Sequence, residues 1–407
     1  MKTVWIVNQY SSTLDTGGGG RHFYLGRELA AQGYKVYIIS SASHHLLLHK
    51  PKLEEPFKIE TICDGFYFVW VKMPDYAQAH SKQRALNWFL FPWRIRKLAG
   101  VIPSKPDAIL SSSPSLMAFL GAQRLARKFK ARLLFEVRDI WPLTLIRIGG
   151  YSASHPFIRL MQWTEDKAYR ESDAVVSNLK NAVEHMVTRG LAREKFTWVP
   201  NGFSLDETKQ ATPLNPLTAM QLPTNQFIVG YTGTLGVANA LDVLIEAAEK
   251  LKDCPHIAFV LVGQGKEKTN LQSQVKEKHL DNVVFVDPIP KAEVHDILKR
   301  FDACYIGALN DDLYQFGIGA NKIPDYLFSA KPIIHSYSGA CDPIEEARAG
   351  ITVPAEDSEK LSEAILKLYS MTPEQRASMG LNGRKVALEQ YEYKKLAEKL
   401  AGVLFKP

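Results

Sequence analysis

The stretch from Gly317 to Asp325 contains residue types that can bind a phosphate and a sugar hydroxyl. It reads Gly317-Ile318-Gly319-Ala320-Asn321-Lys322-Ile323-Pro324-Asp325. Because Pro324 has no amide proton, it fits only the first turn of a helix, and we expect that helix to begin near Ala320 or Asn321, with Asn321 as its N-cap. Free amides at a helix N-terminus bind phosphate, and glycines let the backbone approach the phosphate closely.

Two charged residues of this stretch, Lys322 and Asp325, are three positions apart and therefore share one face of the predicted helix. We expect Lys322 to meet a diphosphate and Asp325 to accept hydrogen bonds from ribose hydroxyls. The alternative is an ordinary loop–helix–strand unit, because Lys and Asp are common on solvated faces.

A second charged pair, Arg138 and Asp139, directly follows the apolar stretch from Ala131 to Val137, which we expect to be a buried strand. Ligands of open α/β sheets bind at the carboxyl ends of the strands, so this position favours a role in chemistry. The alternative is an ion pair that only anchors the loop.

A run of four glycines ends the polar loop that begins at Ser11, and a basic residue follows it. The loop lies between a predicted strand (2–8) and a predicted helix (21–32), as the first turn of a βαβ unit. The spacing G-x-G-x-x-G is missing, so a dinucleotide fingerprint is not supported. We interpret the run as a loop that closes over a phosphate or an acceptor, and a flexible surface loop is the alternative. Its residues are Gly17, Gly18, Gly19, Gly20 and Arg21.

The rest of the chain reads as two α/β series. A length of 407 residues exceeds one hydrophobic core and suggests two domains. We expect a Rossmann-like domain at 1–200, a polar linker at 201–222 and a second Rossmann-like domain at 223–389. A C-terminal helix at about 390–407 is expected to pack back on the first domain. In the second domain the strand ends carry small residues that we expect to line the same crevice as Gly317, namely Gly233, Thr234, Gly263 and Gly265.

The composition argues against several classes of protein. No run of 18 apolar residues is present, so we expect no membrane span, and four scattered cysteines indicate neither a metal site nor disulfides. The net charge of +7 is uneven, because residues 1–200 hold 28 Lys/Arg against 16 Asp/Glu. A basic half suggests a polyanionic or membrane partner. A nucleic-acid binder is disfavoured, since no binding motif is present.

One segment of the basic half, from Gln83 to Lys97, mixes aromatic residues with cations. The aromatic residues are Trp88, Phe89, Phe91 and Trp93, and the cations are Arg84, Arg94, Arg96 and Lys97. This mixture suits the headgroup layer of an anionic bilayer. A core helix with a solvated basic edge is the alternative.

In their order along the chain, these motifs resemble those of the retaining GT-B glycosyltransferases, specifically glycosyltransferase family 4. Within that family they are most similar to the subgroup containing bacterial L-fucosamine transferases of polysaccharide assembly. The resemblance covers essentially the whole chain, and each motif is weak alone while the ordered set is specific. It is carried by Gly17–Arg21 with Leu25–Val36, Glu136–Pro142, Val199–Gly202, Tyr231–Gly236, Leu261–Gly265, and Asn321–Lys322 through Lys331–Pro332.

The resemblance implies an α/β GT-B fold, with two Rossmann-like doubly wound domains facing across a cleft, a nucleotide sugar held mainly by the second domain, and no divalent metal. Asp325 occupies the position of the second glutamate of the family's E-x7-E motif, which contacts ribose. Gly317 replaces the first glutamate, and Thr234 and Asn239 replace the usual cation pair of the diphosphate site. Lys322 is the nearest remaining cation, so we expect it to carry that charge.

The resemblance also implies transfer of an N-acetylated amino or deoxyamino sugar from a UDP-linked donor to a lipid-diphosphate-linked glycan. The enzyme would act in the cytoplasm, peripherally on the inner face of the plasma membrane, in O-antigen or capsule assembly. Lys322 and the amides of Gly317 to Asn321 would stabilise the leaving diphosphate, while Asp139 orients the acceptor hydroxyl. Arg138, which stands where many relatives have a histidine, would balance the Asp139 charge. A UDP-sugar epimerase of the same architecture is the alternative activity.

Overall fold

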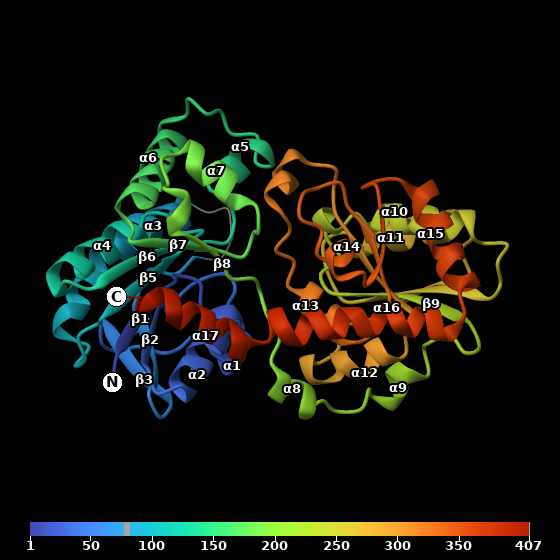
Figure 1. Cartoon of the computed structure of the whole chain (residues 1–407), viewed down its shortest axis with the longest axis horizontal. Coiled ribbons are helices and arrows are strands. Elements are labelled where there is room, and N and C mark those ends of the chain that lie inside the picture. The colour runs from blue at the N-terminus through green and yellow to red at the C-terminus, as the bar shows by residue number, and fades with distance from the viewer. Residues whose placement is uncertain (77–81, 407) are drawn as a thin grey trace. The chain divides into compact units, whose positions relative to one another are not determined.

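The structure is a computed structural model of the chain and describes residues 1–76 and 82–406 (Figure 1). It divides into two compact units, one made of Met1–Asn201 with the chain from Tyr393 onward, and the other of Gly202–Glu392. Each unit is a Rossmann-like α/β domain with a mostly or wholly parallel sheet, which confirms the expected fold class.

The sheet of the first unit has eight strands among the described residues, in the order β3-β4-β2-β1-β5-β6-β7-β8. All neighbours are parallel except β3 and β4, which form an antiparallel hairpin. Continuous apolar runs produce these strands, because a parallel sheet is covered on both faces. The strands are β1 (Thr3–Val7), β2 (Lys35–Ser41), β3 (Phe57–Cys63), β4 (Phe66–Val71), β5 (Ala108–Ser112), β6 (Arg132–Val137), β7 (Ala174–Ser177) and β8 (Phe196–Trp198).

Helices cover both faces of this sheet. Right-handed crossovers place α3, α4 and α6 on one face and α2 on the other, where α17 packs beside α2. Tyr393 of α17 stacks on Tyr24 of α2 with ring centroids 5.0 Å apart. The helices are α1 (Leu14–Gly17), α2 (Arg21–Ala31), α3 (Lys82–Ile95), α4 (Ala118–Phe129), α5 (Leu143–Arg147), α6 (Pro156–Glu171), α7 (Ala182–Thr188), α17 (Tyr393–Leu404), and the 3₁₀ turns η1 (Arg96–Gly100) and η2 (Arg193–Lys195).

The described second unit has a six-stranded parallel sheet in the order β11-β10-β9-β12-β13-β14. Its strands are β9 (Phe227–Thr232), β10 (Ile257–Val262), β11 (Val283–Val286), β12 (Ala303–Gly307), β13 (Ile333–Ser336) and β14 (Gly350–Val353). Its helices are α8 (Leu205–Lys209), α9 (Pro216–Ala219), α10 (Leu241–Lys250), α11 (Lys268–Glu277), α12 (Val294–Lys299), α13 (Lys322–Phe328), α14 (Pro343–Ala347), α15 (Ser358–Ser370) and α16 (Pro373–Val386). Short turns complete it: η3 (Val237–Asn239), η4 (Lys291–Glu293), η5 (Asp312–Phe316) and the π-helix η6 (Ala387–Tyr391).

Both sheets reverse their strand order at one point. In the first unit the chain leaves β1 toward β2 on one side and later adds β5, β6 and β7 on the other. In the second unit β9 leads to β10 and β11 on one side, and β12 begins the other. Crossovers diverge at such a point and leave a crevice at the carboxyl ends of the two central strands. The fold therefore predicts ligand sites beside β1 and β5, and beside β9 and β12.

Several local elements differ from the sequence expectations. The strands β3 and β4 form a hairpin, whose turn at Gly65 has a φ of +74° that suits glycine. The polar loop 11–20 contains the short helix α1, capped by Thr13 and Thr16 in a reciprocal capping box. Of the segment expected to be a linker, residues 202–222 belong to the second unit, where they include α8 and α9, and the Thr212 amide donates to the carbonyl of Ala292.

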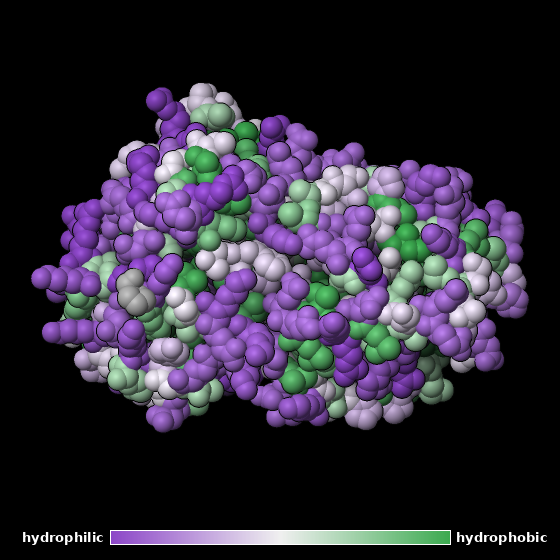
Figure 2. All heavy atoms as spheres, viewed as in Figure 1, coloured by the Kyte–Doolittle hydropathy of each residue, from purple (hydrophilic) through white to green (hydrophobic). Residues whose placement is uncertain are grey.

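The surface and the core differ in polarity as expected for a globular protein. Hydrophilic side chains cover most of the face shown in Figure 2. No helix in the described part of the chain is both long enough and apolar enough to span a bilayer.

The turns after β9 and β10 pack backbone against backbone. A Cβ atom on Gly263 would lie 1.9 Å from the carbonyl oxygen of Gly233, and the φ of Gly263 is +144°. Both the clash and the dihedral therefore require glycine at this position.

We expect Gly263→Ala to lower the free energy of unfolding by about 2–4 kcal/mol, because strain and overpacking add. Gly236→Ala, in the same region, is the matched control, since its Cβ would meet only a methyl group of Thr234 at 3.7 Å. Urea titrations of the two variants check this. Equal midpoints for both would show that the two turns separate without cost.

Candidate active site

The side chain of Lys322 lies at the strand-order reversal of the second unit. Lys322 is the first residue of α13, which follows β12, and its ammonium group reaches across to the end of β9. The Nζ atom donates to the hydroxyl of Tyr231 (2.7 Å) and to Oδ1 of Asn239 (2.9 Å). It also lies 3.9 Å from the centroid of the Tyr231 ring, a cation–π distance.

Neutral groups hold these two acceptors in place. The Tyr231 hydroxyl donates to the carbonyl of Thr234 (2.6 Å), and Nδ2 of Asn239 donates to the same carbonyl (3.0 Å). The second bond fixes the orientation of the Asn239 amide, so that its oxygen faces Lys322. An ammonium group has three protons, and two have acceptors here. No third acceptor and no carboxylate contacts Nζ among the described residues.

The charge state of Lys322 follows from this environment. Burial lowers the pKa of Lys322 to about 7. A buried ammonium without a counter-ion is costly, so the group loses its proton more readily than a solvated lysine. An arriving anion would restore the charge, because an opposite charge nearby favours the protonated form.

The backbone before α13 differs in part from the expectation. Gly317 has a φ of +97°, as a glycine permits, but its amide donates to the carbonyl of Tyr314 and is occupied. Asn321 precedes α13 in helical conformation, and its side chain makes no capping hydrogen bond. The amides of Ile318 and Ala320 donate to no protein acceptor in the part of the chain described. Because α13 has only seven residues, the predicted dipole contribution is smaller than that of the Lys322 charge.

Asp325 lies one turn after Lys322 and has different neighbours. Its carboxylate is 3.6 Å from Nε2 of His295, on α12, and is 28 % exposed. Burial raises the pKa of Asp325 to about 6, the charge of Lys291 opposes this shift, and that of Glu207 adds to it. Lys322 and Asp325 are thus one turn apart on α13, and their side chains contact different groups.

The other residues expected to bind the donor are brought to the same edge of this sheet. Gly233 lies beside Lys322, since a Cβ on it would be 3.4 Å from Nζ. Thr234 is exposed, and its carbonyl organises Tyr231 and Asn239 as described above. Gly263 and Gly265 pack directly against the backbone of this turn. A Cβ on Gly265 would lie 2.0 Å from the carbonyl oxygen of Leu235. Their role is close backbone packing rather than an open approach to a ligand.

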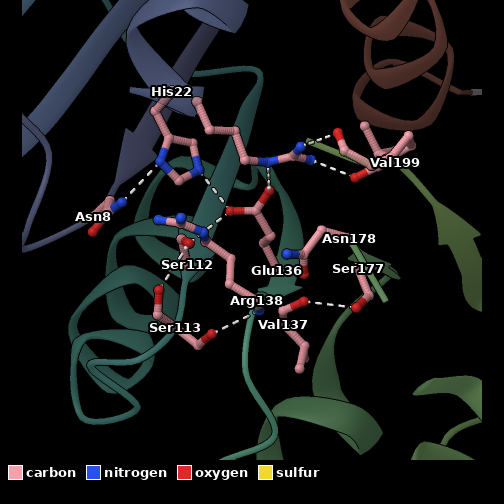
Figure 3. Close-up of polar contacts among 12 residues, drawn as sticks. Asn8, His22, Ser112, Ser113, Glu136, Val137, Arg138, Ser177, Asn178 and Val199 are labelled. Carbon is pink, nitrogen blue, oxygen red and sulfur yellow. Dashed lines mark hydrogen bonds and ion pairs between the residues drawn. The ribbon is translucent and has the colours of Figure 1, made fainter. Parts of the chain in front are cut away.

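A buried polar cluster occupies the strand-order reversal of the first unit (Figure 3). At its centre Glu136, near the end of β6, accepts hydrogen bonds from Nε of Arg21 (2.8 Å), Nε2 of His22 (2.6 Å) and Oγ of Ser112 (2.6 Å). Burial alone would raise the pKa of Glu136, but His22 and Arg21 outweigh it and hold the pKa well below its usual range. Glu136 is therefore an anion inside the protein.

The partners of His22 determine its tautomer. Asn8 at the end of β1 accepts from the amide of Tyr10 through Oδ1 (3.0 Å), so its Nδ2 faces Nδ1 of His22 (2.8 Å). Nδ1 must then accept, and Nε2 carries the proton donated to Glu136. Burial lowers the pKa of His22, in agreement with a neutral ring.

Arg21 serves the interior of the unit, which corrects the expectation that it meets a ligand. Its side chain is 2 % exposed, and beyond Glu136 it donates to the carbonyls of Val199 (2.7 Å) and Pro200. These contacts join the start of α2 to the segment after β8. The side chain is occupied by protein acceptors and is not available to a phosphate.

The predicted Arg138–Asp139 pair is separated in the structure. Figure 3 shows Arg138 turned toward Ser112 and Glu136, and its buried Nε atom has no hydrogen-bond partner. Asp139 is exposed. With Arg21 and Arg138 positive and Glu136 negative, the cluster has one positive charge in surplus.

The glycine run is ordered by its own hydrogen bonds rather than left as a flexible loop. Gly17 ends α1, and Gly18, Gly19 and Gly20 have φ values of +77°, +78° and +97°, which favour glycine. The Ser12 hydroxyl donates to the carbonyl of Gly19 at 3.0 Å. These positive φ values let the chain turn sharply just before α2 begins.

Sequence reasoning missed Glu136, His22, Asn8 and Ser112 as functional candidates. The available signal was the polar character of residues at the carboxyl ends of β1, β5 and β6, where ligands of such sheets bind. Among the described residues, no group of three or more His, Cys, Asp and Glu side chains could hold a metal ion.

Comparison with protein families gives a match in each half of the chain. Residues 17–202 match the family described as "Glycosyl transferase 4-like domain", and residues 226–371 match "Glycosyl transferases group 1". The two matched segments include the polar cluster, except for Asn8, and the surroundings of Lys322.

Individual proteins are similar over most of the chain. The colanic acid biosynthesis glycosyl transferase WcaI of Escherichia coli K12 is 25% identical over 316 residues, covering 75% of this chain and 76% of its own. Sucrose-phosphate synthase from Thermosynechococcus elongatus superposes with a TM-score of 0.73 at 17% identity, covering 99% and 98%. Alr3699/HepE from Anabaena, solved in complex with UDP and glucose, gives a TM-score of 0.68 at 15% identity, covering 100% of both chains.

The Glu136 cluster yields a stability prediction. We expect Glu136→Gln, which removes the charge and keeps the shape, to lower the free energy of unfolding by about 3–5 kcal/mol, because the buried guanidinium group of Arg21 loses its counter-ion. Urea unfolding followed by circular dichroism measures the effect. The control is Glu184→Gln, whose exposed pair with Arg193 contributes little. A Glu136→Gln protein as stable as the control would refute the central role of this carboxylate.

Proposed function

Because the chain belongs to the group 1, family-4-like glycosyltransferases of the GT-B fold, we propose that it transfers a sugar from a UDP-linked donor to a lipid-linked glycan with retention of anomeric configuration. The donor sugar is an N-acetylated amino or deoxyamino sugar, and the product belongs to a bacterial surface polysaccharide. The similarity to WcaI, whose name refers to colanic acid biosynthesis, supports the polysaccharide. The similarity to HepE, which was solved with UDP, supports the nucleotide.

The partly buried, incompletely bonded ammonium group of Lys322 is the observation that carries this proposal. It has two neutral acceptors and no carboxylate in the described part of the chain, at the strand-order reversal where α/β folds bind ligands. A diphosphate supplies the missing charge and the missing acceptor. Thr234 and Asn239, which replace the family's usual cations, are within the hydrogen-bonded group that surrounds Lys322.

The proposed chemistry follows the charges that develop during transfer. The bond between the anomeric carbon and the diphosphate oxygen breaks, its electron pair stays on the diphosphate, and positive charge develops on the sugar ring. Lys322 and the amides of Ile318 and Ala320 stabilise the leaving group. The acceptor hydroxyl attacks from the same face as the leaving group, and the departing phosphate oxygen takes its proton. No protein nucleophile is needed, and the mechanism is proposed to need no metal.

The remaining predicted residues have supporting roles in this scheme. Asp325 accepts hydrogen bonds from ribose hydroxyls, and Nε2 of His295 lies 3.6 Å from its carboxylate. Asp139, exposed at the end of β6, orients the acceptor hydroxyl. Arg138 has an unpartnered Nε and contributes the surplus charge of its cluster, so it balances Asp139 or an acceptor phosphate.

Because the proposed acceptor is linked to a lipid, the enzyme would act at a membrane surface. We propose a peripheral location on the inner face of the plasma membrane, supported by the excess of Lys and Arg in residues 1–200. Exposed aromatic side chains of α3 add to this, namely Phe89 and Trp93, whereas Trp88 and Phe91 are buried core residues. Of the segment from Gln83 to Lys97, only the solvent-exposed face of α3 is therefore proposed to contact the membrane.

Kinetics of two variants test the proposed site. Lys322→Ala should lower kcat by about 10²–10³-fold, since a leaving-group contact is lost in the transition state. Asp325→Ala should raise the donor KM by about 10-fold with a smaller effect on kcat. Wild-type protein is first screened by thermal shift against UDP-, GDP-, ADP- and dTDP-sugars. Unchanged turnover of Lys322→Ala, or isomerisation of the donor without any acceptor, would refute the proposal.

The low pKa of Lys322 gives a separate pH prediction. Protonated Lys322 binds the diphosphate, so UDP affinity should weaken as the pH rises above about 7, by up to about tenfold per unit. Calorimetry between about pH 7.5 and 9 avoids the titration of the phosphate itself, whose second pKa is about 6. Lys322→Met should bind UDP weakly and with little pH dependence. A wild-type affinity that is flat over this range would assign the charge to another group.

A further inference from the structure

A hollow on the first unit gathers cations from two helices. It measures about 390 Å³ and lies between the end of α3 with η1 and the second half of α4. Its lining residues are Trp93, Arg96, Lys97, Arg124, Leu125 and Lys128, which we call the basic groove. No carboxylate lines it, and its size falls in the range of pockets that hold small ligands, roughly 300–1,000 Å³.

The cations of the basic groove are not neutralised by neighbouring carboxylates. Arg127, on the same helix but outside the groove, pairs with Glu171 at 2.6 Å. Arg96, Lys97, Arg124 and Lys128 form no ion pair among the described residues. The sequence explains this, because residues 76–135 contain eleven Lys/Arg and a single acid, Asp107. That carboxylate accepts from the amide of Thr3 (2.7 Å).

An exposed apolar stripe runs along α3 to the same groove. Leu86, Phe89 and Trp93 are spaced by three and four residues and are 52%, 44% and 54% exposed, so they share the solvent face of the helix. Trp93 belongs to both features, and Nζ of Lys97 lies 4.9 Å from its ring centroid. Monomeric proteins rarely expose such a row of large apolar residues without a partner.

We propose that the basic groove binds the phosphate of an anionic phospholipid headgroup while the α3 stripe enters the interface of the same bilayer. Four cations meet the phosphate charge, and Trp93 occupies the headgroup layer that tryptophan prefers. A soluble phosphate would engage the groove but leave the stripe exposed, so the joint occurrence of both features selects a lipid. The proposal rests on the proposed function only for the presence of a membrane, and it adds Arg124 and Lys128 of α4 to the docking surface.

Vesicle binding of the full chain tests the proposal. The groove variant is Arg124→Ala with Lys128→Ala, and the matched control is Arg127→Ala with Arg170→Ala, which removes the same charge outside the groove. On vesicles of phosphatidylcholine with 30 mol% phosphatidylglycerol, the groove variant should bind about 30-fold more weakly, from about fivefold for each of the two basic residues. The control should lose less than about threefold.

Tryptophan quenching tests the apolar part. Brominated acyl chains should quench the fluorescence of wild-type protein more than that of Trp93→Phe, because Trp93 is the aromatic residue joining stripe and groove. Equal losses in the two double variants would show a diffuse surface charge rather than a site and would overturn the proposal. Binding of pure phosphatidylcholine vesicles equal to that of anionic vesicles would also overturn it.

A separate readout distinguishes this proposal from the proposed transferase. The groove variant should keep the melting temperature and the UDP affinity of wild type, since none of its residues belongs to the Lys322 site. Loss of both would show misfolding, and Phe89→Ser, which changes the stripe and no groove residue, then decides the matter by the same vesicle assay. If wild type binds vesicles as expected but not UDP, the transferase proposal fails while the headgroup site stands.

Discussion

A partly buried ammonium group with only neutral acceptors is the constraint on which the second unit depends. Removing a charge from water without a counter-ion is expensive, and the protein lowers that cost for Lys322 through a cation–π contact, two hydrogen bonds and a reduced pKa of about 7. None of these replaces a full negative charge. The site is therefore most favourable when an anion is present, which is the property that a diphosphate site requires.

The backbone geometry around Lys322 follows from the same constraint. Tyr231 and Asn239 can accept from one ammonium group only if the turn after β9 is tight, and that turn is tight because Gly233 and Gly263 pack without side chains between them. The strand-order reversal brings α13 beside β9 although ninety residues of sequence separate them. A helix that followed β10 or β11 would deliver its lysine to a different strand end.

The first unit places its polar cluster at the equivalent point of its own sheet but treats charge differently. Glu136 neutralises Arg21, and the neutral tautomer of His22 adds a hydrogen bond without adding a charge. Asn8, Ser112 and Glu136 come from three adjacent strands, so the cluster also fixes the carboxyl ends of these strands relative to one another. Arg138 adds a positive charge that no carboxylate of the cluster offsets, and Asp139 follows it directly in the chain. The cluster is a rigid support from which one charged segment extends.

Much of this architecture could be predicted from the sequence, because its signals are local. Apolar runs such as 2–8 and 131–137 identified strands, and the C-terminal helix expected at about 390–407 corresponds to α17 (Tyr393–Leu404). Lys322 was predicted from its position beside Pro324 and the absence of other cations. Its partners Tyr231 and Asn239 were not, since their contact depends on the register and order of the strands. His22 and Glu136 were missed for the same reason, being 114 residues apart and joined only by the topology.

The departures from the family's usual motifs form one consistent change rather than separate losses. A cation at position 239 would lie against Lys322 in a buried site, and like charges at hydrogen-bond distance repel strongly. Lys322 can therefore take its place only if residue 239 is neutral and offers an acceptor, which asparagine does. The turn after β9 positions the positive charge, and α13 supplies that charge through Lys322. In the proposed site, a single titratable lysine would then replace two cations that remain charged at neutral pH, and a bound diphosphate would raise the fraction of that lysine that is protonated.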